Sequence, residues 1–300
     1  MAVSHSPLRY PGGKQVLAHV LSQFMRLNGA HGGTYAEPYA GGAGAALALL
    51  YGEHVDRVLI NDADPRIFAF WSSVLHQTSH FVRLVEKTPT TIREWANHRA
   101  IYQQPRRHST LSVGFATFYL NRCNRSGIIA SGGPIGGKEQ KGRWKIDARF
   151  NRADLARRIH RIALYRDRIA LSQLDGVDFL EQYVVPLPEK ARPFVYLDPP
   201  YYAKGRDLYL NYYQPEDHVR LAAWLMDRAM FPWVLTYDDV PAIAKLYRGL
   251  RRLRVDLDYS ARQRRSEREV MILKPGLVVP QGWGRGIPRR FVSASDDVAS

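Results

Sequence analysis

A chain of 300 residues, 45% of them hydrophobic, is long enough to bury a large core, and we expect one domain that carries a large insertion. The sequence has no apolar run near the roughly 18 residues that cross a bilayer and no apolar segment typical of a signal peptide, which argues against a membrane partner and favours the cytoplasm. Its 43 Lys and Arg residues against 28 Asp and Glu give a net charge of +15, which favours a polyanionic partner over a basic protein without one.

The N-terminal part of the chain predicts a helix and then a strand, a helix and a second strand. Hydrophobic periodicity places these elements at Val16–Leu27, Thr34–Glu37, Ala45–Leu50 and Arg57–Ile60. A glycine-rich turn joins the first strand to its helix. This order is typical of the beginning of a doubly wound α/β sheet.

The middle of the chain, from Pro65 to about Ile169, is mostly helical in pattern. A glycine-rich patch over Ser126–Gly142 interrupts it. Asp154–Ile169 reads as a basic amphipathic helix, whose arginines either contact DNA or form a solvated face.

The α/β alternation then resumes. Strands are predicted over Ile169–Leu174, Phe194–Leu197 and Trp233–Thr236, with a helix over Pro215–Met230. A basic hairpin is expected next, ending in the strand Glu269–Leu273. After Pro275 the sequence has little periodicity, which is typical of a loose tail.

Asp198, Pro199, Pro200 and Tyr201 form the strongest local motif, directly after the apolar strand Phe194–Leu197. Open α/β sheets bind ligands at the carboxyl ends of their strands, which is where this motif falls. The alternative is a proline-stiffened turn beside a buried tyrosine.

These residue types suit the methylation of an exocyclic amine. The N6 amine of adenine is a poor nucleophile because its lone pair is delocalised into the ring. The Asp198 carboxylate and the Pro199 carbonyl oxygen would each accept one N–H, which favours a pyramidal nitrogen with its lone pair directed at a methyl donor. The Tyr201 ring would stack on an adenine that has left the duplex stack.

A second motif, Glu37–Gly44, reads Glu-Pro-Tyr-Ala-Gly-Gly-Ala-Gly between a strand and a helix. Its glycines let the backbone approach a ligand closely, but it lacks the Gly-Lys-Ser/Thr ending of a phosphate loop. Asp62, at the end of the next strand, offers a carboxylate for ribose hydroxyls, which suits a nucleoside cofactor. Tight packing of the helix on the strand is the alternative reason for the glycines.

Taken in chain order, four segments resemble those of the Dam-type, alpha-group N6-adenine DNA methyltransferases, and the similarity runs from about Ser6 to Leu273. The segments are Arg9–Lys14 (Arg-Tyr-Pro-Gly-Gly-Lys), Glu37–Gly42, Asn61–Asp62 and Asp198–Tyr201. The resemblance implies an α/β fold with a Rossmann-like, seven-stranded, S-adenosylmethionine-dependent methyltransferase core and a helical target-recognition insertion. The core would comprise residues 1–67 and 167–275, the DNA-binding insertion residues 68–166, and a loose tail residues 276–300.

The resemblance also implies which residues bind S-adenosylmethionine. Tyr10 and Lys14 would help to close the cofactor pocket, and Asp62 would hold the ribose. The residues that would surround the methionine part are Glu37, Pro38, Tyr39 and Gly41.

The cofactor's adenine would meet an acidic–aromatic pair. Asp178 would accept a hydrogen bond from the adenine N6, and Phe179 would pack on the ring. Asp175 lies close to this pair in the sequence and is the alternative acceptor.

In the insertion, Asn121 and Arg122 belong to a Leu-Asn-Arg segment that resembles the part of these enzymes that enters DNA. Beyond it the sequence lacks the family's Arg-Tyr-Asn and Asn-x-Pro-Tyr-Gly elements, so neither the base-reading residues nor recognition of GATC carries over. Arg125, among small neighbours, is the candidate for reading guanine.

Two basic clusters are expected to contact DNA phosphates. The first comprises Lys138, Lys141, Arg143, Lys145, Arg149 and Arg152. The second lies between Arg248 and Arg268.

We therefore expect a site-specific enzyme that transfers a methyl group directly to N6 of an adenine flipped out of double-stranded DNA. The single cysteine, Cys123, does not adjoin Asp198, which argues against cytosine-C5 chemistry, and the ten histidines show no metal-ligand spacing, so no metal is expected. The alternatives are transfer to cytosine N4 or to an RNA adenine and, more remotely, a DNA-binding protein without activity. A monomer is expected. The recognition site stays open, as does the choice between restriction–modification, phage protection and a housekeeping mark.

Overall fold

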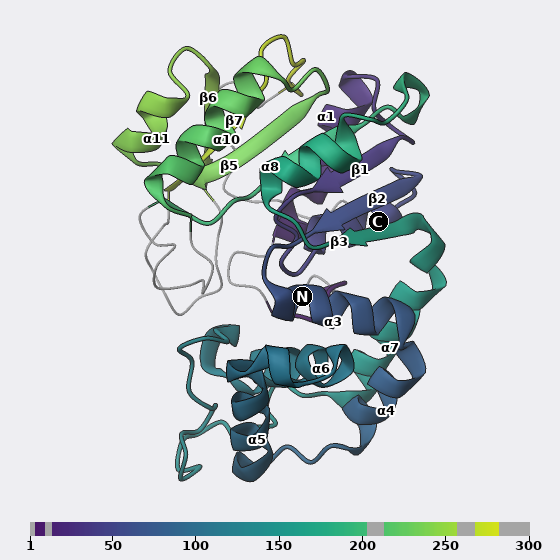
Figure 1. The fold of residues 1–300 in the computed structure, drawn as a ribbon, viewed down its shortest axis with the longest axis vertical. Coiled ribbons are helices and arrows are strands. Elements are labelled where there is room, and N and C mark those ends of the chain that lie inside the picture. The colour runs from purple at the N-terminus through teal and green to yellow at the C-terminus, as the bar shows by residue number, and fades with distance from the viewer. Residues whose placement is uncertain (1–3, 10–13, 203–212, 257–267, 282–300) are drawn as a thin grey trace, which may run out of the picture.

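The computed structural model describes residues 4–9, 14–202, 213–256 and 268–281. Within these residues, seven strands form one sheet in the order β3-β2-β1-β4-β5-β7-β6 (Figure 1). The strands are β1 (Thr34–Glu37), β2 (Arg57–Asn61), β3 (Ile169–Ser172), β4 (Phe194–Leu197), β5 (Trp233–Asp238), β6 (Arg251–Asp256) and β7 (Arg268–Leu273). The first five strands in this order are parallel, and β7 is antiparallel to both of its neighbours. The predicted α/β class with a Rossmann-like, mostly parallel core of seven strands is confirmed.

Helices cover both faces of the sheet and also form a bundle beside it (Figure 1). Those around the sheet are η1 (Lys14–Leu17), α1 (Ala18–Leu27), α2 (Gly44–Tyr51), η4 (Arg166–Arg168), α8 (Gly176–Phe179), η5 (Leu180–Val184), η6 (Glu189–Ala191), α10 (Pro215–Asp227) and α11 (Pro241–Leu246). Those of the bundle are α3 (Pro65–His76), α4 (Thr78–Lys87), α5 (Ile92–Gln103), η2 (Pro105–Arg107), α6 (Thr110–Cys123), η3 (Arg125–Gly127) and α7 (Arg152–Leu164). None of the described helices is long and apolar enough to cross a membrane.

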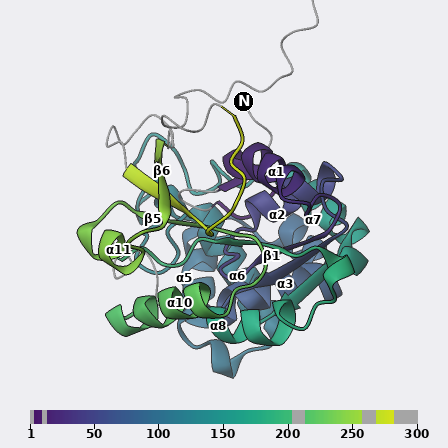
Figure 2. The same ribbon diagram turned by 90° about the horizontal axis from the view of Figure 1, so that it is seen from above.

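Side chains alternate between two hydrophobic cores along the buried strands, as the period of a strand requires. Tyr35 and Phe194 pack on the face covered by α1 and α2, whereas Ala36 and Val195 pack on the opposite face against α8 and α10. Figure 2 shows α1 and α2 on one side of the sheet and α8 and α10 on the other. The sheet is thus the middle layer of three.

The strand order reverses direction between β1 and β4. These strands are parallel neighbours, with Ala36 opposite Val195, but the chain continues from β1 toward β2 and from β4 toward β5. Loops that leave adjacent strand ends in opposite directions form the usual ligand site of an open α/β sheet. Glu37 ends β1 and Asp198 follows β4, so both sequence motifs meet at this point.

The insertion packs on the sheet through a shared core. Phe70 of α3 stacks on Phe118 of α6 with ring centroids 6.1 Å apart, and Phe81 of α4 meets Phe118 edge-on at 5.5 Å. These rings belong to the same buried cluster as Tyr35 of β1. The predicted insertion boundary at residue 68 falls inside α3, because this helix begins at Pro65.

The predicted basic hairpin and the predicted loose tail differ in part from the structure, and the glycine-rich patch is non-helical apart from η3, as predicted. The predicted basic hairpin is formed by β6 and β7, but the short helix α11 precedes it, and residues 257–267 between its strands lie outside the described part of the chain. The glycine-rich patch is built of turns with one isolated bridge between Asn124 and Pro134. The predicted loose tail begins with an anchored segment, because the Asn28 side chain exchanges two hydrogen bonds with the Val278 backbone, at 2.8 and 2.9 Å.

Close packing of α6 on α3 makes a testable prediction. A Cβ atom at Gly114 would lie 2.4 Å from the Ala69 carbonyl oxygen, so Gly114→Ala should lower the free energy of unfolding by about 1–3 kcal/mol through overpacking. Gly133→Ala is the matched control, because a Cβ there has no atom within 4 Å. Urea denaturation measures both, and equal stability of the two variants would contradict the close packing.

Candidate active site

Glu37 ends β1 with its carboxyl group buried. Its Oε1 accepts hydrogen bonds from the Tyr35 hydroxyl at 2.9 Å and from the Ala46 amide of α2 at 3.0 Å. Burial raises the pKa of Glu37 to about 8, in spite of these two donors. The carboxyl is therefore mostly protonated at neutral pH, and a cation placed beside it would favour its charged form.

The turn after Glu37 brings backbone close to the end of β2. Gly41 and Ala43 both have left-handed backbone, with φ of 47° and 46°. Asp62 Oδ2 accepts the Gly41 amide at 2.9 Å, and its Oδ1 accepts the Asp64 amide at 3.0 Å. Burial, together with the charge of Asp64, raises the pKa of Asp62 to about 7.

Asn61 ties together the loops after three strands. Its side-chain amide donates to the carbonyl oxygens of Pro38 and Leu174, each at 2.9 Å. Its Oδ1 accepts from the Ser172 hydroxyl and the Leu174 amide, also at 2.9 Å. Because Asn61 is fully buried, these bonds set how the loops after β1, β2 and β3 lie relative to one another.

Asp198 follows β4 and is held from two sides. Its Oδ1 accepts the Thr236 hydroxyl of β5 at 2.7 Å and lies 3.5 Å from Lys14 Nζ. Burial raises the pKa of Asp198 to about 6, against the opposing charge of Lys14. The side chain is still 24% exposed, and no described residue donates a hydrogen bond to its second oxygen, Oδ2.

Lys14, predicted to help close the cofactor pocket, lies beside the Asp198 carboxylate. Its Nζ donates to the Tyr201 hydroxyl at 3.0 Å and to the two carboxylate oxygens of Glu269 at 2.9 and 2.8 Å. The Tyr201 hydroxyl also donates to Glu269. Glu269 was not identified from the sequence, where it is only the first residue of an apolar strand.

The predicted motif after β4 is compact. Pro199 is buried, and Pro200 and Tyr201 are half-buried beside it. The structure therefore brings all four predicted catalytic residues together with Lys14. Tyr10, predicted beside Lys14, lies outside the described residues.

Tyr39 connects the glycine turn to the loop after β3. Its ring lies so close to Gly176 that a Cβ there would be 2.2 Å from the Tyr39 hydroxyl. That hydroxyl is 2.7 Å from the Tyr213 hydroxyl, which donates to Asp175 at 3.1 Å.

The acidic–aromatic pair lies on α8, after β3. Asp178 forms an ion pair with Arg220 of α10 at 2.5 Å, and Arg220 also contacts Asp175 at 3.3 Å. Phe179 is 1% exposed and stacks on Tyr183, with ring centroids 5.6 Å apart. The role of this pair in holding the cofactor's adenine stays a prediction.

The chemistry of this edge fits a cationic nucleoside. Glu37, Asp62 and Asp198 are carboxyl groups whose pKa values are raised by burial, so each gains from a nearby cation or hydroxyl donor. An ammonium group, a sulfonium group and ribose hydroxyls are such partners. Among the described residues, no group of three or more His, Cys, Asp or Glu is arranged to hold a metal ion.

Two of the predicted DNA-binding residues, Asn121 and Arg122, are buried and bonded within the protein, so the structure gives no support to their predicted contact with DNA. Asn121 is fully buried, and its side chain accepts the Arg9 amide at 2.6 Å and donates to the Arg9 and Gly127 carbonyls at 2.8 and 3.0 Å. Arg122 is 8% exposed and donates to the Pro7 carbonyl at 2.6 Å. Both side chains hold the N-terminal segment on α6.

In the second basic cluster, Arg262, Arg264 and Arg265 lie outside the described residues. Four other predicted DNA contacts are accessible. Arg125, Lys138, Lys141 and Arg143 are exposed, as is Trp144, over whose ring the Arg143 guanidinium lies at 5.4 Å. Arg152 differs from its cluster, because it donates to the carbonyls of Val85 and Thr88 inside the insertion.

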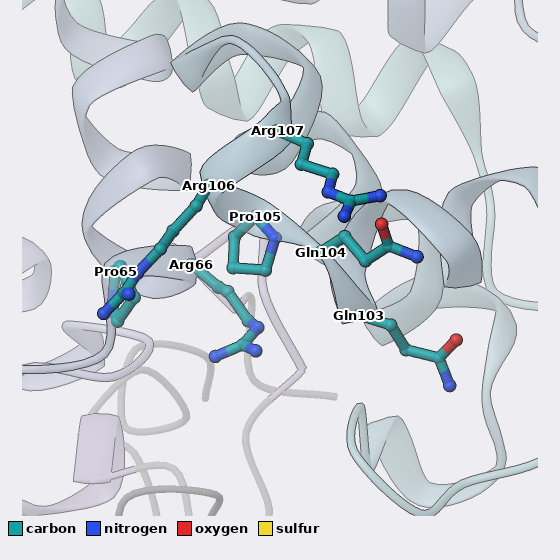
Figure 3. Close-up of a pocket in the computed structure, with 7 residues that line it drawn as sticks. All are labelled: Pro65, Arg66, Gln103, Gln104, Pro105, Arg106 and Arg107. Atoms are coloured by element: carbon teal, nitrogen blue, oxygen red, sulfur yellow. The ribbon is translucent and has the colours of Figure 1, made fainter.

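A hollow of about 650 Å³ lies between the start of α3 and η2, near Asp62 in the sequence (Figure 3). Three arginines line it: Arg66, Arg106 and Arg107. Arg66 is fixed by the Tyr102 carbonyl at 2.9 Å, whereas Arg106 and Arg107 are exposed. Arg106 and Arg107 are adjacent in the chain, and the fold brings Arg66 of α3 to the same hollow.

Comparison with known proteins agrees with this geometry. The family described as D12 class N6 adenine-specific DNA methyltransferase matches residues 10–261. One solved structure, the rRNA methyltransferase aviRa from Streptomyces viridochromogenes, is similar over 88% of this chain and 86% of its own, with 14% identity and a TM-score of 0.36. That similarity is too distant to support a conclusion. None of the curated proteins that were compared matches the chain.

Proposed function

Because the chain belongs to the D12 class of N6 adenine-specific DNA methyltransferases, which methylate adenine in DNA, we propose that its methyl donor is S-adenosylmethionine and that Asp198 binds the target amine. The role of Asp198 is supported by how its two carboxylate oxygens are hydrogen-bonded. Thr236 and Lys14 contact Oδ1, while the side chain is 24% exposed and Oδ2 accepts from no described residue. A preorganised acceptor of this kind costs no reorganisation when the amine arrives.

Asp198 Oδ2 accepts one N6–H of the adenine, and the Pro199 carbonyl oxygen accepts the other. These two bonds hold the nitrogen lone pair out of conjugation with the ring. When the nitrogen has taken the methyl group it loses a proton, for which Oδ2 is the acceptor in contact with it. The hydroxyl bonds of Tyr201 to Lys14 and Glu269 fix its ring, which stacks on the flipped base.

The bound cofactor supplies a methyl group on a sulfonium centre. Glu37 binds the ammonium group of its methionine part, with Pro38, Tyr39 and Gly41 around it. Asp62, already oriented by two backbone amides, accepts from the ribose hydroxyls. Support comes from the raised pKa values of both carboxyls, which favour a cationic partner and hydroxyl donors.

Double-stranded DNA binds along the exposed basic residues of the insertion. Lys138, Lys141 and Arg143 contact phosphates, and Arg125 reads a base edge. Trp144, exposed between Arg143 and Lys145, adds an aromatic surface to this strip.

The proposed role of Asp198 predicts a selective loss of chemistry. Asp198→Ala should lower single-turnover methylation by on the order of a hundredfold or more and leave the affinity for DNA largely unchanged, because one oriented transition-state contact is lost. Mass spectrometry of nucleosides from methylated DNA measures the product. N6-methyladenine is expected from the wild type, whereas N4-methylcytosine, or near-normal turnover by a pure Asp198→Ala preparation, would contradict the proposal.

Residues that contact phosphates and residues that read bases should affect DNA affinity differently, the first through its dependence on salt and the second through its dependence on sequence. Lys141→Ala should weaken binding to all duplexes alike and reduce the salt slope by roughly one unit. Arg125→Ala should cost about 1–3 kcal/mol on the cognate duplex and relax specificity at one position. Lys190→Ala, exposed at the amino end of β4, is the matched control and should change neither. A uniform loss on cognate and scrambled duplexes for Arg125→Ala would make Arg125 a phosphate contact.

A further inference from the structure

The Lys14 ammonium group joins strand β7 to the loop after β4. It contacts both carboxylate oxygens of Glu269, the Tyr201 hydroxyl and Asp198 Oδ1 within 3.5 Å. We propose that Glu269 is a positioning residue, which holds Lys14 against Asp198 so that Asp198 stays ionised as the acceptor for the target amine. This inference rests on the proposed function of Asp198.

The Lys14–Glu269 pair is almost completely removed from water. Glu269 is 1% exposed and Lys14 is 7% exposed. A buried ion pair is often no more stabilising than apolar side chains of the same volume, whereas removal of one partner leaves a costly lone charge. Stability alone therefore does not explain why two charged residues occupy these positions. Their effect on the ionisation of Asp198 does explain it.

Lys14 carries its charge throughout the neutral range. Burial lowers its pKa, but Asp198, Tyr196 and Glu269 outweigh burial and raise the pKa well above the usual value. The same charges act on Asp198 in opposite senses. Burial raises the pKa of Asp198, Lys14 lowers it, and Glu269 raises it.

Among the described residues, other titratable groups face Asp198 from the elements packed around it. They are Tyr35 and Glu37 of β1, Tyr196 of β4, Tyr201, Tyr237 of β5 and Glu269 of β7, with Lys14 of η1 as the cation. Tyr35, Tyr196 and Tyr237 are uncharged at neutral pH and Glu37 is mostly protonated. Among the described residues, removal of Lys14 therefore leaves Glu269 as the charge that opposes ionisation of Asp198. Its bond to Glu269 keeps the ammonium group from leaving toward solvent.

The pH dependence of single-turnover methylation tests the two charges separately. Lys14→Met removes the cation, so the acid limb of the rate profile should move up by about one pH unit. Glu269→Gln removes the second carboxylate but keeps an acceptor for Lys14, so the limb should move down. Lys274→Met is the matched control, because Lys274 donates to the Ala229 carbonyl instead and should leave the limb in place.

Positioning is separated from charge by a further variant. Glu269→Ala removes the charge and the acceptor together, so Lys14 is no longer held against Asp198 and the acid limb should lie at higher pH than in Glu269→Gln, by up to about one pH unit. An unshifted limb in both Lys14→Met and Glu269→Gln, or an upward shift in Glu269→Gln, would overturn the proposal. So would an acid limb at the same pH in Glu269→Ala and Glu269→Gln.

For variants that fold but lack activity, the pKa of Asp198 can be measured without turnover. Carbon-13 NMR of carboxyl-labelled aspartate, with the Asp198 signal assigned through Asp198→Asn, reports the Asp198 pKa directly. It should rise in Lys14→Met and fall in Glu269→Gln. These shifts in an enzyme that makes no N6-methyladenine would support the electrostatic role and refute the proposed function, whereas an active enzyme with an unmoved Asp198 signal would refute the role of Glu269. If Lys14→Met does not fold, the Glu269→Gln titration decides.

Discussion

Strands β1 and β4 pair in parallel at the middle of the sheet, yet the chain leaves them in opposite directions. Their loops consequently diverge, and the residues at both strand ends face the same space. Glu37 at the end of β1 and Asp198 after β4 are placed there by the sheet itself, and Asn61 adds the end of β2 through buried hydrogen bonds. The buried carboxyl groups of Glu37, Asp62 and Asp198 therefore gather where these loops diverge, which is where we propose that the cofactor and the target base meet.

Burial gives these carboxyl groups their chemistry. Water would hold each of them ionised, but the packed strands remove it and raise the pKa values of Glu37, Asp62 and Asp198. Glu37 and Asp62 thus gain most from the partners that a cationic nucleoside brings. Asp198 instead has a cation beside it, Lys14, which favours its ionised form; that is the form the proposed role as acceptor for the amine requires. At one edge of the sheet, burial therefore raises the pKa values of all three carboxyl groups, but Asp198 also has the Lys14 cation beside it.

Sequence patterns were sufficient for features that depend on neighbouring residues. Thr34–Glu37 and Phe194–Leu197 were predicted with the bounds of β1 and β4, because both are short apolar runs bounded by turn residues. Contacts between residues far apart in the chain have no such pattern in the sequence. Lys14 and Glu269 are 255 residues apart in the chain, and they meet because β7 pairs with β5. Asn121 is buried because the N-terminal segment crosses α6. Family resemblance assigned Asn121 and Arg122 to DNA, whereas burial assigns them to the protein interior.

Cofactor binding between β1 and β2 is tested most directly by calorimetry at pH 7 in buffers of different ionisation enthalpy. Glu37, with a pKa of about 8, is mostly protonated before binding, and an ammonium group beside it should displace that proton. S-adenosylmethionine binding to the wild type should therefore release close to one proton more than binding to Glu37→Gln. Equal proton release by the two proteins, at measurable affinity in both, would place the ammonium group away from Glu37 and contradict the account.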